Sequence, residues 1–215
     1  MPDFSMLFLG MAAFFGIHLI GVLPLGDRLR DILGRNAYRA LYSLLSLAGL
    51  VFIVIGYRKA PFEPIFWHPP LWAEYVPFLL MPFAVILLVG SYLSQDTKRI
   101  TRHPMLWAVA LWAGTHLAAN GAASDLALFG GFLVFALVMQ PLADRKTARR
   151  DPEAWRMLKA QTSLLPFAAI LAGRAGERVG DFWVNAVLYG LMVFLAAVFV
   201  HATILGIAVA PGFPG

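Results

Sequence analysis

Six long apolar runs, separated by short charged loops, constrain this chain more than any other feature. Each run is about 17–25 residues long, the length that an α-helix needs to cross a bilayer. Apolar residues make up 60% of the chain and charged residues only 13%, against about 25% charged residues in ordinary soluble domains. We therefore predict an all-α integral membrane protein with one domain over residues 1–215 and six transmembrane helices near 4–24, 38–57, 72–93, 104–120, 126–143 and 181–207.

The basic residues predict how these helices are oriented. The loops after the first, third and fifth runs hold four, three and eight Lys and Arg residues, which leaves only Arg58 and Lys59 of the 17 for the other side. Short loops rich in Lys and Arg stay in the cytoplasm. We expect both termini on the non-cytoplasmic side of a multi-pass protein in a bacterial inner (plasma) membrane.

The long loop between the fifth and sixth runs carries two further signals. Residues 151–160 begin with Asp-Pro and have the pattern of an amphipathic helix, with Asp151 as N-cap. Residues 161–173 are apolar but too short to cross a bilayer, and Pro166 interrupts them. We predict a cytoplasmic interfacial helix followed by a shallow membrane-surface segment.

Two function classes are excluded by composition. The chain has no cysteine, so disulfides, thiolate catalysis and iron–sulfur clusters are ruled out. Its net charge of +5 comes from loops between apolar runs, which topology explains better than a nucleic-acid partner does. The expected surroundings are the lipid bilayer.

Three of the five histidines, His18, His116 and His201, lie inside predicted spans. An embedded imidazole is costly without a partner, so it marks either a functional site or a hydrogen bond between helices. Neutral imidazole is a good ligand for iron, copper and zinc, and a bis-histidine heme in a helical bundle needs no other protein ligand. Three such residues in one chain favour a metal or heme site over purely structural roles.

His103 and His116 stand at the two ends of the fourth run. His103 follows the basic residues Lys98, Arg99 and Arg102 and precedes Pro104, which places it at the membrane surface. It suits either a structural hydrogen bond in the loop or contact with an anionic group or substrate. Thirteen residues of helix separate the two rings by about 20 Å and put them on opposite faces, so they cannot share an iron. Helical spacing places Trp112 and Asn120 on the same face as His116. They would supply an apolar wall and a hydrogen bond for a ligating histidine, or they would simply be part of the bundle core.

Several strings in the chain resemble the NnrU family, which is related to zeta-carotene cis–trans isomerase. They are F-x-G-x-H in the first run, ending at His18; RITRHP at 99–104; H-L-x-x-N-G at 116–121; TSLLPFAAI at 162–170; and F-x-H ending at His201. The resemblance runs in order along almost the whole chain. It implies an integral membrane protein that uses heme b with two axial histidines and isomerises a carbon–carbon double bond by a redox-gated ligand switch.

Carried onto this sequence, the resemblance implies His18 and His116 as iron ligands and catalytic residues. Depth in the membrane complicates this pairing, because His18 lies on the cytoplasmic side of its span and His116 on the outer side. His201 is therefore the alternative ligand of His116. Arg28, Arg99 and Arg102 are expected partners for heme propionates, and His103 is a further cofactor-contacting residue.

Two other functions compete with a heme isomerase. NnrU proteins are associated with denitrification, which favours a non-catalytic maturation or assembly factor for nitrite or nitric oxide reductase, with a respiratory enzyme as partner. RHP followed by an E-x-W-x-x-L-K helix also resembles isoprenylcysteine carboxyl methyltransferases, which implies S-adenosylmethionine near His103 and Glu153, Trp155, Leu158 and Lys159. The chain departs from that motif at Pro152, where a second acidic residue is usual.

Overall fold

A computed structural model describes residues 3–93, 95–176, 182–201 and 203. In this part of the chain the all-α prediction is confirmed, since it has no strand and its only β-type pairing is the isolated bridge between Ile65 and Ala122. The elements in chain order are α1 Ser5–Val22, α2 Pro24–Leu33, α3 Arg35–Lys59, η1 Leu71–Tyr75, α4 Val76–Leu93, α5 Thr97–Ile100, α6 Pro104–Ala119, α7 Ala123–Asp125, η2 Leu126–Gly130, α8 Gly131–Arg150, α9 Pro152–Gln161, α10 Ala168–Leu171 and α11 Phe182–Val200.

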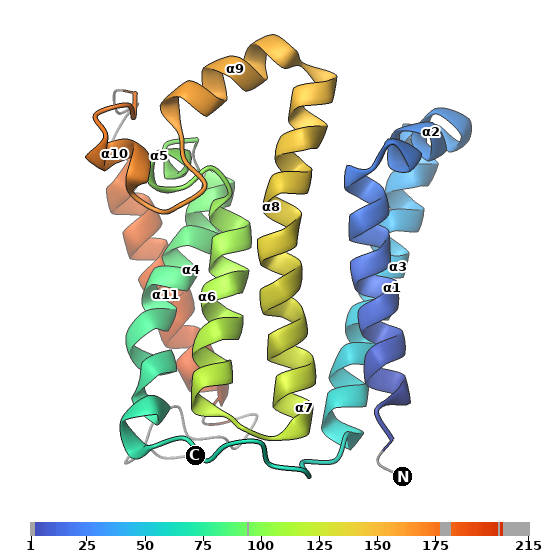
Figure 1. The fold of residues 1–215 in the computed structure, drawn as a ribbon, viewed down its shortest axis with the longest axis vertical. Coiled ribbons are helices and arrows are strands. Elements are labelled where there is room, and N and C mark those ends of the chain that lie inside the picture. Colours follow the sequence, from blue (N-terminus) through green and yellow to red (C-terminus); the bar gives the residue numbers. More distant parts are fainter. Residues whose placement is uncertain (1–2, 94, 177–181, 202, 204–215) are drawn as a thin grey trace.

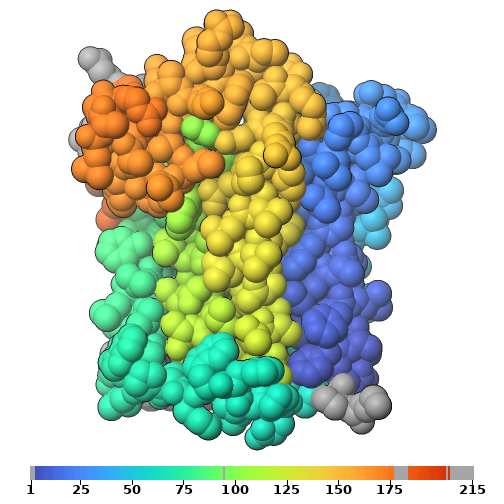
Figure 2. Space-filling model, viewed as in Figure 1, coloured from blue at the N-terminus to red at the C-terminus, as the bar shows by residue number. Residues whose placement is uncertain are grey.

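The long helices run alternately up and down between two ends of the bundle (Figure 1). α1 and α3 form one side, α4, α6 and α11 form the other, and α8 lies between them. α2, α5, α9 and α10 lie at one end, which we call the basic end because the loops rich in Lys and Arg are there. We call the opposite end the outer end, after the predicted topology. The segment that joins α3 to η1 crosses it, and Figure 2 shows the same segment over this end.

Four helical stretches are long and apolar enough to span a membrane: Ser5–Val22, Arg35–Lys59, Leu71–Leu93 and Ala123–Arg150. Their exposed side chains include Leu44, Leu47 and Leu79, each about 60% exposed or more, as expected of surfaces that face lipid. α6 and the apolar part of α11, Val184–Val200, are shorter. Both lie where the fourth and sixth spans are predicted, although 181, 202 and 204–207 of the latter are outside the described residues. Six crossings, and the side of the termini, stay predictions.

Close backbone contact through glycine joins α1 to α3. A Cβ atom at Gly56 would lie 2.4 Å from the backbone nitrogen of Leu7, and one at Gly49 would lie 2.8 Å from the backbone nitrogen of Phe14. Small residues allow helices in a membrane to approach this closely, where packing rather than the hydrophobic effect holds them together.

Replacing Gly56 by alanine should therefore destabilise the protein by about 1–3 kcal/mol, because its new methyl group meets backbone rather than a movable side chain. Gly16 in α1 is the matched control, since a Cβ there meets nothing within 4 Å. Melting temperatures of both variants in the same detergent check this. Equal melting temperatures for Gly56→Ala and Gly16→Ala would contradict it.

The basic end is covered by the chain after α8. Asp151 caps α9 as predicted, since its Oδ1 accepts a hydrogen bond of 2.9 Å from the backbone N–H of Ala154. α9 lies across the end of the bundle, and α10 follows it there (Figures 1 and 2). Leu165, Phe167 and Leu171 are 66, 54 and 85% exposed, a composition suited to a membrane surface. The interfacial position of this segment stays a prediction.

Candidate functional site

Arg102 is the centre of a buried polar cluster at the basic end. Its side chain is only 7% exposed, and its Nη1 donates to Asp144 Oδ2 of α8 at 2.5 Å. Its Nε donates to Thr162 Oγ1 at 2.9 Å and its Nη2 to the Thr162 carbonyl at 3.1 Å, while its guanidinium lies 4.8 Å from the ring centre of Trp155. We call Arg102, His103, Asp144 and Thr162 the arginine cluster. A buried guanidinium with a carboxylate and two further acceptors satisfies the requirement for burying a charge.

His103 contacts the other oxygen of the same carboxylate. Its Nε2 lies 2.7 Å from Asp144 Oδ1, so a neutral ring donates its Nε2–H to Asp144. Burial lowers the pKa of His103 below its ordinary value, and Arg102 and Lys98 act in the same direction, although Asp144 opposes them. His103 is therefore neutral at pH 7, and its hydrogen bond to Asp144 is the structural contact that the sequence allowed.

The lowered pKa of His103 predicts a pH dependence of stability. The unfolded chain binds a proton on His103 more readily than the folded chain does. The contribution of neutral His103 to the free energy of unfolding is therefore complete above about pH 6.5, the ordinary histidine pKa, and is lost as the pH falls. Melting temperatures between pH 8 and pH 5 should fall more steeply for the wild type than for His103→Gln, whose amide still donates to Asp144. Parallel curves for the two proteins would rule out His103 as the titrating group.

The strings RITRHP and TSLLPFAAI pack against each other in this cluster. Arg102 N donates to the Ser163 carbonyl at 2.8 Å, Thr101 Oγ1 to the Leu164 carbonyl at 2.9 Å, Trp107 Nε1 to the same carbonyl at 2.7 Å, and Phe167 N to the Ile100 carbonyl at 2.7 Å. The two strings thus fasten the start of α6 to the segment after α9.

The residues that resemble the methyltransferase motif are divided between this cluster and the surface. Trp155 stacks on Arg102, whereas Glu153 forms an exposed ion pair of 2.7 Å with Arg156. Arg99 is partly buried, and its Nη1 has no partner in the described part of the chain. These positions do not show a contact to S-adenosylmethionine, which stays a prediction.

His116 lies near the outer end of α6, among aromatic rings. Its Nδ1 lies 2.8 Å from the Trp112 carbonyl, so Nδ1–H donates to it and Nε2 is left with a free lone pair. The ring is stacked on Phe129 at 5.0 Å between centroids and lies 5.8 Å from Trp112. The wall predicted at Trp112 is therefore present. A backbone bond at Nδ1 that fixes the tautomer and orients Nε2 is typical of metal-ligating histidine.

Asn120 has a different partner from the predicted one. Its Nδ2 donates to the backbone carbonyl of His116 at 2.8 Å rather than to the imidazole. α6 ends at Ala119, and the last carbonyls of a helix lack partners within it. Gly121 follows because the Trp67 carbonyl approaches so closely that a Cβ would overlap it. The H-L-x-x-N-G string thus ends the helix that carries His116.

The structure places His201, at the end of α11, beside His116. The two ring centroids are 6.5 Å apart with 42° between the ring planes, and His201 Nδ1 is buried without a partner in the described part of the chain. A metal ion bound by two imidazoles at about 2.0–2.1 Å each places the ring centroids on the order of 6 Å apart. The separation of the two ring centroids therefore matches the one expected for two imidazoles on one metal ion.

His18 lies elsewhere in the bundle. Its Nδ1 is 2.7 Å from the Phe14 carbonyl, and its ring contacts Phe14, Tyr42 and Phe135 at centroid distances of 4.3, 5.2 and 6.0 Å. No contact joins His18 to His116 or His201 in the described part of the chain. The structure thus brings together His116 and His201, the alternative pair, and not His18 and His116.

Sequence reasoning missed Asp125 and Asp144, two carboxylates that join segments far apart in the chain. Asp144 holds the arginine cluster, and Asp125, only 5% exposed, accepts a hydrogen bond of 2.5 Å from the Tyr57 hydroxyl. Asp125 Oδ2 also accepts from the backbone N–H of Ala122 at 3.3 Å. Asp125 and Asp144 flank the fifth apolar run. A carboxylate directly beside an apolar run was the signal that could have marked these two residues as candidates. Within the described residues, no group of three or more His, Cys, Asp or Glu side chains could hold a metal ion, and the histidine pair has two members.

Comparisons with known proteins agree with the resemblance drawn from the motifs. The family model described as "NnrU protein" matches residues 6–209. The chain is 28% identical over 201 residues to "15-cis-zeta-carotene isomerase, chloroplastic" of Arabidopsis thaliana, covering 80% of this chain and 52% of that protein. It is 27% identical over 179 residues to the Zea mays protein of the same name, covering 74% and 49%. The chain spans about half the length of these relatives. No solved structure matches it significantly.

Proposed function

Because this chain belongs to the NnrU family, we propose that it is a heme b-binding membrane isomerase that acts on a double bond of a hydrophobic polyene. Its relatives are named as isomerases of 15-cis-zeta-carotene, a molecule that partitions into the apolar bilayer. Apolar helices are the surroundings such a substrate needs. The observation that carries the proposal is the pair of embedded imidazoles, His116 and His201, at 6.5 Å.

The ring separation favours His116 and His201 as the residues that would hold the iron, although the family resemblance implies His18 and His116. Trp112 orients the His116 ring through its carbonyl, and the rings of Trp112 and Phe129 pack beside it. The unpartnered Nδ1 of His201 leaves this ring free to present either nitrogen. A bound heme would supply a redox-active iron whose ligand strength changes with oxidation state.

The expected propionate partners need revision for this pair. Arg99 and Arg102 lie at the basic end, about 20 Å along α6 from His116, and Arg102 already binds Asp144 and Thr162. The basic residues on the outer side are Arg58 and Lys59, next to the Tyr57 that bonds Asp125. We propose that Arg58 and Lys59 pair with the propionates of a heme held by His116.

An absorption spectrum of the detergent-purified protein, oxidised and then reduced with dithionite, tests this function. We expect a Soret band, sharp reduced α and β bands, and about one heme per chain in a pyridine hemochrome assay, with conversion of 15-cis-zeta-carotene by the heme-loaded protein. A colourless protein after expression with added heme would overturn heme binding. Heme without conversion would leave a heme protein that is no carotene isomerase.

A role in denitrification, a respiratory-enzyme partner and a bacterial plasma membrane stay predictions, and the two relatives carry "chloroplastic" in their names. A maturation factor predicts a stable complex with a reductase and no turnover of its own. Co-purification of such a complex with an inactive protein would favour this alternative.

A further inference from the structure

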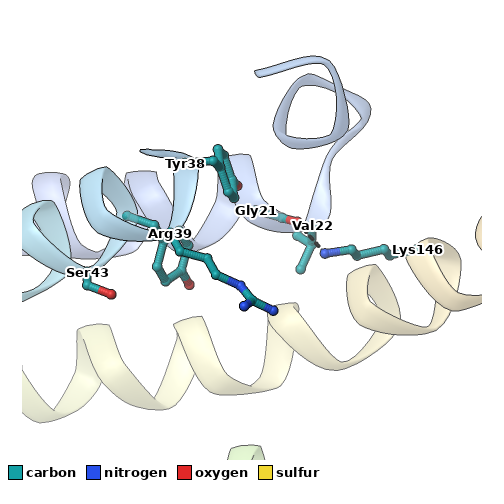
Figure 3. A pocket seen from close by; sticks show the side chains of 7 residues that line it. Gly21, Val22, Tyr38, Arg39, Ser43 and Lys146 are labelled. Atoms are coloured by element: carbon teal, nitrogen blue, oxygen red, sulfur yellow. Dashed lines mark hydrogen bonds between the residues drawn. The ribbon is translucent and has the colours of Figure 1, made fainter. Parts of the chain in front are cut away.

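A pocket of about 360 Å³ opens at the basic end between α1, α3 and α8, away from both the histidine pair and the arginine cluster. The residues that line it are Gly21, Val22, Tyr38, Arg39, Tyr42, Ser43 and Lys146. In Figure 3 the side chains of Arg39 and Lys146 extend into the space between these helices from α3 and α8. At about 30 Å³ per water molecule, the volume is roughly that of a dozen waters, enough for a phosphodiester group with a small alcohol.

The lining presents hydrogen-bond donors that the protein does not use. Within the described residues, the side chains of Arg39, Tyr38, Tyr42 and Ser43 make no hydrogen bond; Arg39 and Ser43 are exposed, and Tyr38 and Tyr42 are half-buried. Lys146 Nζ donates once, to the Gly21 carbonyl at 2.7 Å, which leaves two of its protons. A guanidinium, an ammonium and three hydroxyls around one space are the donor set that binds a phosphate.

No carboxylate lines the pocket to neutralise these cations. Asp27 interacts with Lys146 at longer range, but its carboxylate is already paired with Arg30. Arg149, one turn beyond Lys146, donates to the Val22 carbonyl at 2.8 Å and adds positive charge beside the pocket. The local potential therefore selects an anion.

The position of the pocket identifies the source of that anion. It lies where α1 ends, where α3 begins and where the last turns of α8 leave the apolar run, which is the level of the lipid headgroups for helices that span a bilayer. Leu41 and Leu44, 46 and 65% exposed, follow on α3 toward the membrane interior. We propose that this pocket binds the phosphate of an anionic phospholipid, with Arg39 and Lys146 as its charge partners and the hydroxyls of Tyr38 and Ser43 as further donors.

Lipid-dependent stabilisation of the delipidated full-length protein tests the proposal. Its six tryptophans allow melting temperatures to be read from intrinsic fluorescence. Dioleoylphosphatidylglycerol should raise the melting temperature saturably, and equal concentrations of dioleoylphosphatidylcholine or inorganic phosphate should not. In Arg39→Gln/Lys146→Gln the midpoint concentration should rise about thirtyfold, from two lost charges near the headgroups.

Arg145→Gln/Lys159→Gln is the matched control, because it removes the same charge at the same end from exposed residues that do not line the pocket. It should keep the wild-type midpoint. An unchanged midpoint in the pocket variant, or an equal loss in the control, would overturn the proposal, as would equal stabilisation by phosphatidylcholine or by free phosphate. If the pocket variant does not fold, Tyr38→Phe/Ser43→Ala removes two donors without a charge, and a wild-type midpoint there overturns the proposal.

Discussion

Replacing His116 by alanine is expected to abolish heme incorporation in the purified protein. Nδ1 of this ring donates to the Trp112 carbonyl, which orients Nε2, and the ring centroid lies 6.5 Å from that of His201. Even removal of an outer partner of a metal ligand costs about 10–100-fold in affinity, so loss of the ligand itself should cost at least as much. The pyridine hemochrome assay on protein of normal elution profile measures this directly.

The companion variants decide which histidine is the second ligand. His201→Ala should lose heme as His116→Ala does, whereas His18→Ala should retain it, because His18 lies among Phe14, Tyr42 and Phe135. Loss of heme in His18→Ala with retention in His201→Ala would establish the pair that the family resemblance implies. Full heme content in the His116→Ala variant would remove His116 from the site altogether.

Replacing Asp144 by alanine should produce the largest loss of stability among the single substitutions considered. It leaves the Arg102 guanidinium, 7% exposed, without a counter-charge and removes the partner of His103. Breaking a buried ion pair by removing one member costs about 3–5 kcal/mol. For a chain of this size that corresponds to a fall of roughly 6–20 °C in melting temperature.

Two variants make this result specific to the buried pair. Glu153→Gln removes a carboxylate from the exposed pair with Arg156, whose side chains are 68 and 75% exposed, and should change stability by less than about 1 kcal/mol. Arg102→Met in the Asp144→Ala background should recover part of the loss, because the uncompensated charge is then gone. If Asp144→Ala melts within a degree or two of Glu153→Gln, the arginine cluster does not stabilise the fold.

The helical content was predictable because a bilayer leaves the backbone little choice. Backbone groups in lipid must be hydrogen-bonded within the segment, so a long apolar run becomes a helix almost regardless of its detailed sequence. The same regularity placed Trp112 one turn before His116 and Asn120 one turn after it, and both contacts with His116 are present. Spacing alone did not show that Asn120 binds the backbone of His116 rather than its ring.

Contacts between distant helices were less accessible to sequence reasoning. Helix periodicity fixes which residues share a face but not how far each helix is rotated in the bundle. His201 therefore could be compared with His116 only by depth, which did favour that pair, while the family pattern pointed to His18. Asp144 pairs with residues about forty positions earlier and Asp125 with Tyr57, 68 positions earlier; nothing local in the sequence marks either pair.

The long sequence separation within the arginine cluster has a consequence for how the protein is made. Arg102 enters the membrane region 42 residues ahead of Asp144 and 60 ahead of Thr162. At about 5–20 residues per second, its guanidinium is synthesised roughly 2–8 seconds before its counter-charge exists. Until then Arg102 has no counter-charge within the protein, and its buried contacts form only when the chain beyond α8 folds against the start of α6. The arginine cluster can therefore be complete only once the chain has been synthesised past α9 to Thr162.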